Sequence, residues 1–337
     1  MEGLVRLAII GIGYWGPNLV RNFSRIPEAS IEYLCDINTS SIESVAYLVP
    51  QAKKTGCIEE VLESDIDAVV VASPAVTHYE IALKALSSRK HVFVEKPIAL
   101  KVSEAEELVR VAAEKGLILM VGHLMLYHPA VNYLKQLVES GELGEILYLY
   151  SQRLNLGRLR KDENVVWSLA PHDISMIFYL KNSRPVQVSC VGGDYLRDGI
   201  EDVAFIDIKF EDGSLAHIHV SWLDPHKTRK LTIVGSKKMA VFDDMESSEK
   251  IKIFDKGVTS APQVAQYGEE ISLRFGDIVI PYLKMQEPLY LECKHFIDCI
   301  REGRQPVSDG KNGLEVVRVL EACDRSLSLG GQPVSLA

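Results

Sequence analysis

Residues 5–16 read VRLAIIGIGYWG, a six-residue apolar stretch that runs into three glycines with the spacing G-x-G-x-x-G. In a strand–turn–helix unit, Gly11 permits the tight turn, Gly13 lets the backbone approach a pyrophosphate, and Gly16 lets the helix pack on the strand. The free N–H groups at the start of that helix attract phosphate. The stretch therefore predicts a dinucleotide-binding loop at the start of a parallel sheet.

An acidic residue closes the next apolar stretch, residues 31–36. Asp36 lies 20 residues after Gly16, the spacing at which a carboxylate accepts a hydrogen bond from the ribose 2′-OH of NAD. Its charge would repel a 2′-phosphate, and residues 37–40 contain no Arg or Lys. The pattern predicts NAD rather than NADP as the cofactor. The alternative is that Asp36 only caps a turn.

The first 122 residues alternate short apolar stretches with amphipathic ones. Continuous apolar strands indicate a parallel sheet that helices cover on both faces. Thr77 and Ser103, each followed three residues later by Glu, fit the capping box of a helix start, and Gly116 fits a helix stop. Further strands are expected at residues 67–72, 91–94 and 117–121, with a weak one at 52–54.

The pattern changes after Gly122. Successive strands with short turns, among them Asp212-Gly213, predict an antiparallel sheet, whereas residues 243–285 give no clear pattern. The predicted fold is α/β: a Rossmann dinucleotide-binding domain at residues 1–122 and a second α/β domain at 123–337, built on a large, mostly antiparallel open sheet. In the second domain, helices are expected at residues 129–140 and in two C-terminal segments. Its strands are expected at residues 146–154, 186–196, 203–210, 215–222 and 231–234.

Composition excludes several classes of protein. The chain of 337 residues has a net charge of −9, which is unfavourable for binding nucleic acid. Its six cysteines include no C-x-x-C pair, which argues against a zinc site and a disulfide scaffold. No apolar run approaches the ~18–20 residues of a membrane helix, and the N-terminal residues do not resemble a signal peptide. We expect a cytoplasmic protein without metal, membrane or nucleic-acid partners.

A lysine stands at the end of the predicted strand 91–94, in Glu95-Lys96-Pro97. Ligands of open parallel sheets bind beyond the carboxyl ends of the strands, and Ser73-Pro74 follows strand 67–72 at the same edge. A Lys beside a nicotinamide can hold a substrate oxygen and polarise it as a hydride leaves. The alternative is a surface Lys96 paired with Glu95.

Three motifs together resemble the Gfo/Idh/MocA family of sugar and cyclitol oxidoreductases: the glycine loop, Ala72-Ser73-Pro74-x-x-x-His78, and Glu95-Lys96-Pro97. The resemblance implies a Rossmann domain followed by an α/β domain whose open sheet packs in oligomers and carries the substrate site. It also implies that Lys96 and a His of the second domain form the catalytic pair. The expected cofactor-binding residues are Gly11, Gly13, Tyr14, Trp15, Gly16, Asp36, Ser73, Pro74, His78, Glu95, Lys96 and His123.

His172 is the expected catalytic histidine. Many family members carry a segment Asp-x-Gly-x-His here, and this chain matches at His172 but has Ser168 and Ala170 in place of the Asp and Gly. Asp173 is the nearest carboxylate, and a carboxylate beside an imidazole would raise its pKa and fix its tautomer. We therefore expect Asp173 to assist His172, at the start of an apolar helix that runs through Tyr179.

Residues 153–161 hold four cations in an otherwise acidic protein. Arg side chains bind phosphate or carboxylate oxygens, so the cluster predicts an anion site; the alternative is a solvated loop balanced by the following acidic residues. The expected substrate-binding residues are Lys96, Tyr127, Arg153, Asn155, Arg158, Arg160, Trp167, His172 and Asp173.

The run from residue 155 to 173 and the segments 287–296 and 308–310 resemble one branch of the family. Members of this branch oxidise the 3-hydroxyl of a UDP-N-acetylglucosamine or UDP-N-acetylglucosaminuronate unit, and a transaminase then converts the ketone, in cell-envelope polysaccharide biosynthesis. The resemblance implies NAD-dependent oxidation of such a sugar. The alternatives are a dehydrogenase for a free cyclitol or hexose, a 3-ketoreductase, and a non-catalytic NAD sensor. An open sheet face implies a homodimer or homotetramer.

Overall fold

The computed structural model describes residues 3–157, 163–260 and 271–336. The chain forms two compact units. The first comprises Met1–Tyr127 together with Gln286–Arg318, and the second comprises His128–Met285 together with Val319–Ala337. A segment near the C-terminus thus returns to the N-terminal unit, which the sequence patterns did not reveal.

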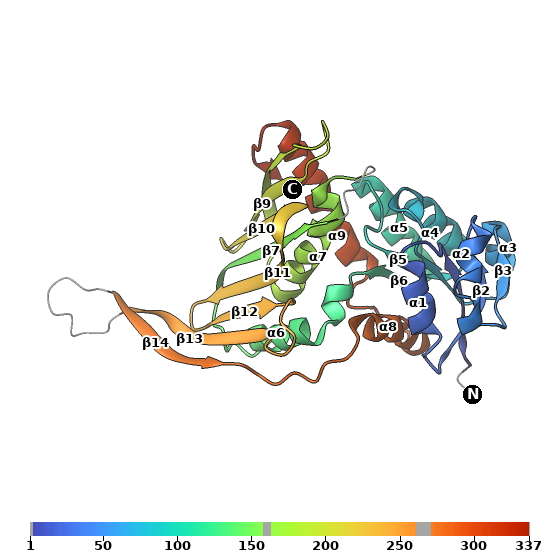
Figure 1. The fold of residues 1–337 in the computed structure, drawn as a ribbon, viewed down its shortest axis with the longest axis horizontal. Helices are drawn as coiled ribbons and strands as arrows, with labels where there is room; N and C mark the ends of the chain where they lie inside the picture. Colours follow the sequence, from blue (N-terminus) through green and yellow to red (C-terminus); the bar gives the residue numbers. More distant parts are fainter. Residues whose placement is uncertain (1–2, 158–162, 261–270, 337) are drawn as a thin grey trace. The chain divides into compact units, whose positions relative to one another are not determined.

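The first unit contains a six-stranded, all-parallel sheet (Figure 1). The order of its strands is β3-β2-β1-β4-β5-β6, so the chain reverses its direction of travel across the sheet between β1 and β4. Open α/β sheets bind their ligands at the carboxyl ends of the strands beside such a reversal. The strands are β1 (Val5–Ile10), β2 (Ala29–Cys35), β3 (Lys53–Thr55), β4 (Ala68–Val71), β5 (His91–Glu95) and β6 (Leu119–Gly122).

Helices flank this sheet (Figure 1). They are α1 (Gly16–Phe23), α2 (Thr39–Glu43), α3 (Ile58–Glu63), α4 (His78–Ser87), α5 (Val102–Lys115) and the returning α8 (Pro288–Glu302), with short 3-10 turns η1 (Ala46–Leu48), η2 (Ala75–Thr77) and η3 (Leu124–Tyr127). Phe23 of α1, Phe93 of β5 and Phe296 of α8 meet edge to face, with ring centroids 5.7–6.4 Å apart. This aromatic cluster fixes α8 against the sheet.

The helix starts differ from the expected capping boxes. Thr77 precedes α4 but makes no side-chain bond to the helix, because its hydroxyl donates to the carbonyl of Pro74 instead. Lys101 precedes α5, so Ser103 lies within the first turn rather than before it. The expected stop is confirmed: Gly116 ends α5 with a φ of 63°, a left-handed conformation that suits glycine.

The second unit contains a nine-stranded sheet in the order β14-β13-β12-β11-β7-β10-β9-β8-β15. All its neighbours are antiparallel except β7 and β10, and Asp212-Gly213 forms the turn between β9 and β10. β13 and β14 lie within residues 243–285, where the apolar pattern predicts no clear element. The strands are β7 (Ile146–Leu156), β8 (Pro185–Gly193), β9 (Val203–Phe210), β10 (Leu215–Ser221), β11 (Leu223–Gly235), β12 (Met239–Asp243), β13 (Ile251–Ser260), β14 (Ile271–Val279) and β15 (Val334–Ser335).

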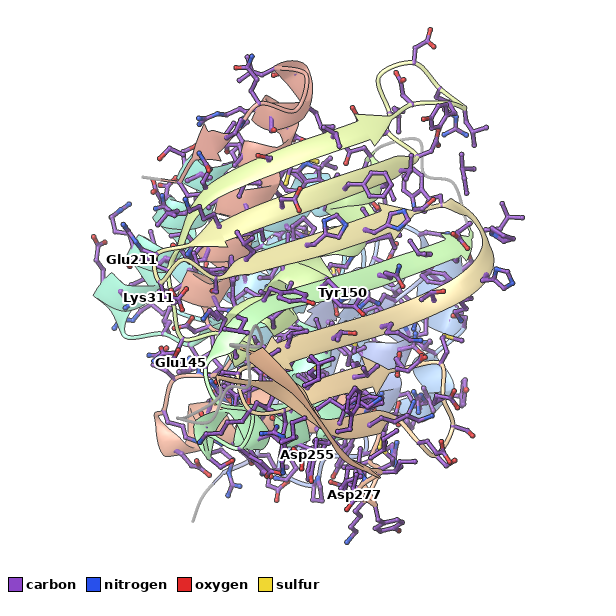
Figure 2. The ribbon with its side chains drawn as sticks, turned by 90° about the vertical axis from the view of Figure 1, so that its left-hand side faces the viewer. Glu145, Tyr150, Glu211, Asp255, Asp277 and Lys311 are labelled. Carbon is purple, nitrogen blue, oxygen red and sulfur yellow. The ribbon has the colours of Figure 1, made fainter. Side chains whose placement is uncertain are left out.

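Helices α6 (Pro129–Glu139) and α7 (Val165–Leu180) pack on one face of this sheet. Among the described residues, no helix lies in front of the other face, which Figure 2 turns toward the viewer. Burial alternates along β9, as expected for a sheet with one covered face. The long helix α9 (Gly310–Ser328) begins in the first unit and continues into the second. Within the described ranges, no helix has the length and apolar character needed to cross a membrane.

Candidate active site

The glycine loop joins β1 to α1, and each glycine has a distinct environment. Gly11 has a φ of 95°, and a Cβ there would lie 2.4 Å from the backbone nitrogen of Ser73. A Cβ on Gly16 would lie 2.2 Å from the carbonyl oxygen of Gly11. A Cβ on Gly13, by contrast, would meet nothing within 4 Å. Gly11 and Gly16 are thus required by packing, and Gly13 leaves open space that a pyrophosphate can use.

Asp36 follows β2 and reaches the glycine loop. Its Oδ2 accepts a 2.6 Å hydrogen bond from the Ile12 N–H, and its Oδ1 accepts one of 2.7 Å from the Asn38 N–H. The carboxylate therefore stabilises both the loop and the turn before α2. It remains only partly buried, at the strand end where a ribose would lie. Together with the open Gly13, it makes the first unit fit an NAD dinucleotide.

His78 connects two of the predicted site segments. Its buried ring lies with Nδ1 2.7 Å from the carbonyl oxygen of Pro97 and Nε2 2.8 Å from that of Ser73. Burial lowers the pKa of His78, against the raising effect of these two carbonyls. The ring thus holds the loop after β4, which includes Pro74, against the loop that carries Lys96. The structure gives His78 a positioning contact in the protein interior.

Lys96 directly follows β5 and is partly exposed. Its backbone N–H lies 3.3 Å from Oε2 of Glu95, and the Trp15 side chain hydrogen-bonds the same carboxyl group. Burial raises the pKa of Glu95 to about 7, against the lowering effect of the Lys96 charge. A Cβ on Gly122, the partner of Glu95 in the sheet, would lie 2.8 Å from Glu95 Oε2. The carboxyl group thus lies directly over Gly122.

His123 follows β6 and is fully buried. Neither ring nitrogen has a hydrogen-bond partner among the described residues. Burial, with a smaller contribution from the charge of Lys96, lowers the pKa of His123 to about 3, so its ring is neutral at physiological pH. Two buried ring nitrogens without partners next to Lys96 are consistent with the predicted contact to the cofactor.

Tyr127, a predicted substrate residue, is buried in η3. Its hydroxyl lies 2.8 Å from the hydroxyl of Ser308, which in turn donates to the carbonyl of Val121 at 2.7 Å. Ser308, in the segment before α9, therefore connects Tyr127 of η3 with Val121 of β6. The sequence did not identify Ser308 as a functional partner, although the motif Ser308-Asp309-Gly310 contributed to the branch resemblance.

In the second unit, His172 lies inside α7 rather than before it. The helix starts at Val165 because the Asn164 side chain caps it, accepting hydrogen bonds from the N–H groups of Val166 and Trp167. The expected start near His172 is therefore wrong, because Pro171 is accommodated within the helix. His172 is partly exposed, one residue beyond this interruption of the backbone hydrogen bonds.

Asp173 contacts Arg153. The Nε of Arg153 on β7 donates to Oδ2 of Asp173 at 2.5 Å, and both side chains are buried. Trp167 is also held within this unit, because its indole N–H donates to Asp324 of α9 at 2.8 Å. Asn155 lies near the end of β7, partly buried. The other three cations of the predicted anion site, Arg158, Arg160 and Lys161, lie outside the described residues.

The structure thus collects the predicted residues in two groups. In the first unit, the glycine loop, Asp36, Ser73, Glu95 and Lys96 lie at the carboxyl ends of β1, β2, β4 and β5. In the second unit, the described members of the other group lie on two elements, Arg153 and Asn155 on β7 and Trp167, His172 and Asp173 on α7. The sequence reasoning missed the buried Glu292 of α8. A carboxylate on the apolar stripe of that helix was the available sign.

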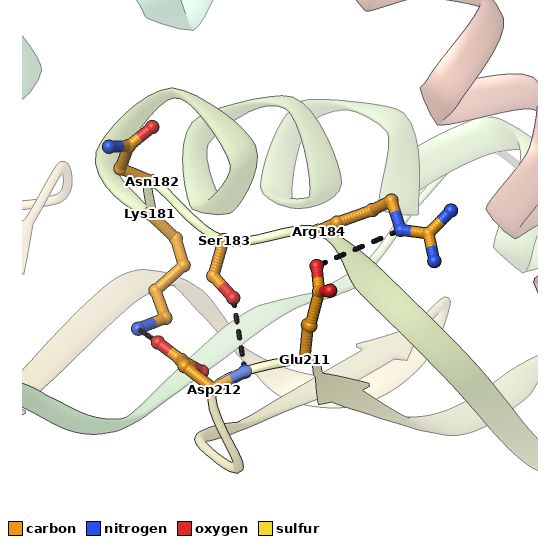
Figure 3. Close-up of a pocket in the computed structure, with 6 residues that line it drawn as sticks. All are labelled: Lys181, Asn182, Ser183, Arg184, Glu211 and Asp212. Atoms are coloured by element: carbon orange, nitrogen blue, oxygen red, sulfur yellow. Dashed lines mark hydrogen bonds and ion pairs between the residues drawn. The ribbon is translucent and has the colours of Figure 1, made fainter.

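Two other features of the described residues bear on the site. No group of three or more His, Cys, Asp or Glu side chains in the described ranges is arranged to hold a metal ion. A surface pocket lies between the end of α7 and the β9–β10 turn (Figure 3), but its charges pair internally, Lys181 with Asp212 and Arg184 with Glu211. None of the predicted site residues lines this pocket.

Comparison with known proteins identifies relatives over the whole chain. Residues 5–123 match the profile described as "Oxidoreductase family, NAD-binding Rossmann fold", and residues 131–241 match "GFO/IDH/MocA C-terminal domain". The UDP-N-acetylglucosamine 3-dehydrogenase of Acidithiobacillus ferrooxidans is 26% identical, with 93% of this chain and 94% of that protein aligned. Its solved structure superposes with a TM-score of 0.80, covering 96% of this chain and 98% of that one, at 24% identity.

Two further relatives extend the comparison. The scyllo-inositol 2-dehydrogenase (NAD⁺) of Bacillus subtilis is 24% identical, with 91% of this chain and 89% of that protein aligned. The structure of a putative oxidoreductase from Magnetospirillum magnetotacticum is 30% identical and superposes with a TM-score of 0.80, covering 95% of this chain and 100% of that one.

Proposed function

Because this chain belongs to the Gfo/Idh/MocA family of NAD-dependent oxidoreductases acting on hydroxyl groups, we propose that its substrate is a nucleotide-activated amino sugar such as UDP-N-acetylglucosamine. The reaction is oxidation of a ring hydroxyl, at C3, to a 3-keto sugar for later transamination in cell-envelope polysaccharide biosynthesis. The observation that carries this proposal is Lys96 at the carboxyl end of β5, on the sheet edge that also bears the glycine loop. The near full-length similarity to a UDP-N-acetylglucosamine 3-dehydrogenase supports the substrate class.

The proposed mechanism assigns one task to each residue. Bound NAD would supply the acceptor for the hydride of the sugar carbon. His172 removes the proton from the hydroxyl as general base, and Lys96 donates a hydrogen bond to the same oxygen and stabilises its developing negative charge. Asp173 assists indirectly, by fixing the guanidinium of Arg153 beside the helix that carries His172.

The remaining predicted residues complete the proposed substrate site. Asn155, Arg158 and Arg160 are the proposed contacts of the diphosphate, whereas the guanidinium of Arg153 is buried and paired with Asp173. The buried side chains of Tyr127 and Trp167 stabilise the segments around the site. The proposed cofactor contacts are Gly11, Gly13, Tyr14, Trp15, Gly16, Asp36, Ser73, Pro74, Glu95 and His123 together with Lys96. His78 acts on this site indirectly, because its ring positions the loops that carry Ser73 and Lys96.

The decisive experiment is a substrate panel. The protein is incubated with NAD and a series of UDP- and TDP-sugars, and NADH absorbance is followed. Each reaction is run with and without 2-oxoglutarate as an acceptor that reoxidises NADH. We expect UDP-N-acetylglucosamine or its uronate to react. No NADH formation with any nucleotide sugar would contradict the substrate class.

Substitution of the two proposed catalytic residues tests the mechanism. Lys96→Ala and His172→Ala should each lower turnover by ~10²–10⁴-fold, because each removes a group that acts on the reacting oxygen. Lys101→Ala is the matched control, since Lys101 lies in the following segment with 71% of its side chain exposed. Full activity in either alanine variant would overturn that assignment.

A dehydrogenase for a free cyclitol is the second candidate, because the scyllo-inositol 2-dehydrogenase of Bacillus subtilis also aligns over most of the chain. It predicts that inositols or hexoses react with NAD and that nucleotide sugars neither bind nor react. The same residues would serve a 3-ketoreductase, which NADH oxidation with the 3-keto sugar detects. A non-catalytic NAD sensor would bind NAD and turn over nothing in either panel.

We also propose that the protein is a homodimer or homotetramer that works in the cytoplasm. Apolar side chains on the uncovered sheet face support an oligomer, since isolated chains rarely expose such a surface. The six cysteines are free, which suits a reducing compartment.

A further inference from the structure

Glu292 is the most unusual buried group in the first unit. It lies on α8 with none of its surface exposed, and neither carboxyl oxygen has a hydrogen-bond partner among the described residues. An ionised carboxylate in such a place is strongly disfavoured, and a buried carboxyl group without hydrogen-bond partners is rare in folded proteins. Nothing in the proposed reaction uses this residue.

The register of two elements places Glu292 beside Glu95. The rings of Phe93 on β5 and Phe296 on α8 contact each other, with centroids 5.7 Å apart. Glu95 lies two residues beyond Phe93, on the same face of the strand, and Glu292 lies one turn before Phe296, on the same face of the helix. Both carboxyl groups therefore adjoin the same aromatic contact.

The electrostatics of the two groups agree with this placement. Burial raises the pKa of Glu292 well above its usual range, and the charge of Glu95 raises it further. Lys96, in contrast, favours the ionised form of Glu95, as does the hydrogen bond from the Trp15 side chain. Two carboxyl groups in this setting cannot both be ionised without a large penalty, so one proton remains with the pair.

The other groups around the pair do not remove this requirement. Burial raises the pKa of both Tyr127 on η3 and Cys293 on α8, so both of these neighbours are neutral. His123 is held neutral by burial and by Lys96. Lys96 is thus the cation next to the pair in the described structure, and it balances one negative charge rather than two.

We propose that Glu292 is a protonated positioning residue whose carboxyl group supports ionised Glu95, and through Glu95 the loop that carries Lys96. Glu95 sits over Gly122, accepts from Trp15 of the glycine loop and lies against the Lys96 backbone N–H. Fixing this carboxylate therefore fixes the position of Lys96 relative to the glycine loop. The catalytic role of Lys96 rests on the proposed function, but the protonation of Glu292 does not.

Infrared spectroscopy tests the protonation without any substrate. The difference spectrum between wild type and Glu292→Gln at pH 7 should show loss of the carbonyl stretch of a protonated carboxyl group. Asp298→Asn on the same helix is the matched control, because Asp298 forms an ordinary ion pair with Lys294 at 2.9 Å and should contribute no such band. Absence of the band in wild type would overturn the proposal.

Thermal unfolding gives an independent readout with a defined sign. The unfolded chain ionises Glu292 above pH ~4.3, whereas the folded protein keeps its proton, so stability falls as the pH rises above that value. Glu292→Gln removes this loss and should gain several degrees in Tm relative to wild type at pH 8, with a smaller gain at pH 5. An equal shift at both pH values would overturn the proposal.

Activity on whichever substrate the panel identifies tests the positioning role. Glu292→Gln keeps a neutral side chain of the same size beside Glu95 and should keep wild-type kcat/KM at pH 7, whereas Glu292→Ala leaves a cavity there and should lose ~10–10²-fold. Equal losses in both variants would contradict a neutral side chain at this position. If no sugar reacts, the infrared and unfolding results still decide the protonation, so failure of the proposed function stays distinguishable from failure of this inference.

Discussion

At some positions of the first unit, close contacts with neighbouring side chains determine which residue type can be accommodated. Gly122 shows this, because the carboxyl group of Glu95 occupies the space that a Cβ would need, at a distance of 2.8 Å. The same carboxyl group lies against Lys96 and Trp15. The absence of a side chain at Gly122 therefore leaves the space in which the carboxyl group of Glu95 lies next to Lys96.

A methyl group at this position provides a test at the residue scale. Gly122→Ala should lower the free energy of unfolding by about 1–3 kcal/mol, because the added atom displaces Glu95 from a packed site. It should also reduce turnover, since Glu95 contacts the Lys96 backbone. Urea unfolding and the NADH assay measure the two effects.

Gly56→Ala is the control for stability, because its Cβ would make only an ordinary 3.6 Å contact with the Asp36 carbonyl. If the two variants have the same free energy of unfolding, Glu95 can move aside without loss of stability. That result would contradict a fixed position of its carboxyl group.

At the scale of secondary-structure elements, a buried ion pair joins β7 to α7. Arg153 and Asp173 are 8% and 1% exposed in their side chains, and Asp173 adjoins His172 in the sequence. The pair therefore holds the helix that carries the proposed general base against the sheet. Buried pairs of this kind gain little stability over apolar residues, but removal of one partner leaves an uncompensated charge.

Single and double substitutions separate these effects. Arg153→Met and Asp173→Leu should each lower the free energy of unfolding by about 3–5 kcal/mol, because each leaves one buried charge unpaired. The double variant Arg153→Met/Asp173→Leu should recover most of this stability. Chemical denaturation of the four proteins measures the coupling. Additive losses in the double variant would show that the two side chains do not act as a pair.

At the scale of the whole molecule, the uncovered face of the nine-stranded sheet carries apolar and aromatic side chains (Figure 2). Tyr148 and Tyr150 of β7 stack there, and Phe205 of β9 stacks on His219 of β10 with ring centroids 4.3 Å apart. The exposed fraction is 44% for Tyr148, 37% for Tyr150 and 39% for Phe205. Such a surface supports the proposed contact between copies of this chain.

Positive charges introduced on the uncovered sheet face test the oligomer. The double substitution Tyr150→Lys/Phe205→Lys should convert the protein to a monomer, because association would bury unpaired charges. Size-exclusion chromatography with light scattering measures the mass. Tyr47→Lys, 76% exposed on η1 of the first unit, is the control and should leave the mass unchanged. A wild-type mass in the double variant would place the interface elsewhere.

Local sequence patterns determined much of this protein. The glycine loop, Asp36 at the end of β2 and Lys96 at the end of β5 follow from strand burial and chain direction, because the carboxyl ends of parallel strands share one edge. The parallel and the mostly antiparallel sheets follow from the period of their apolar residues.

Only the tertiary structure decided which distant residues become partners. The return of α8 to the first unit, Glu292 beside Glu95, and the contact of Asp173 with Arg153 depend on how separate elements pack. Periodicity shows that a residue faces the interior, but it carries no information on which residue of another element lies opposite, because packing across elements sets that register.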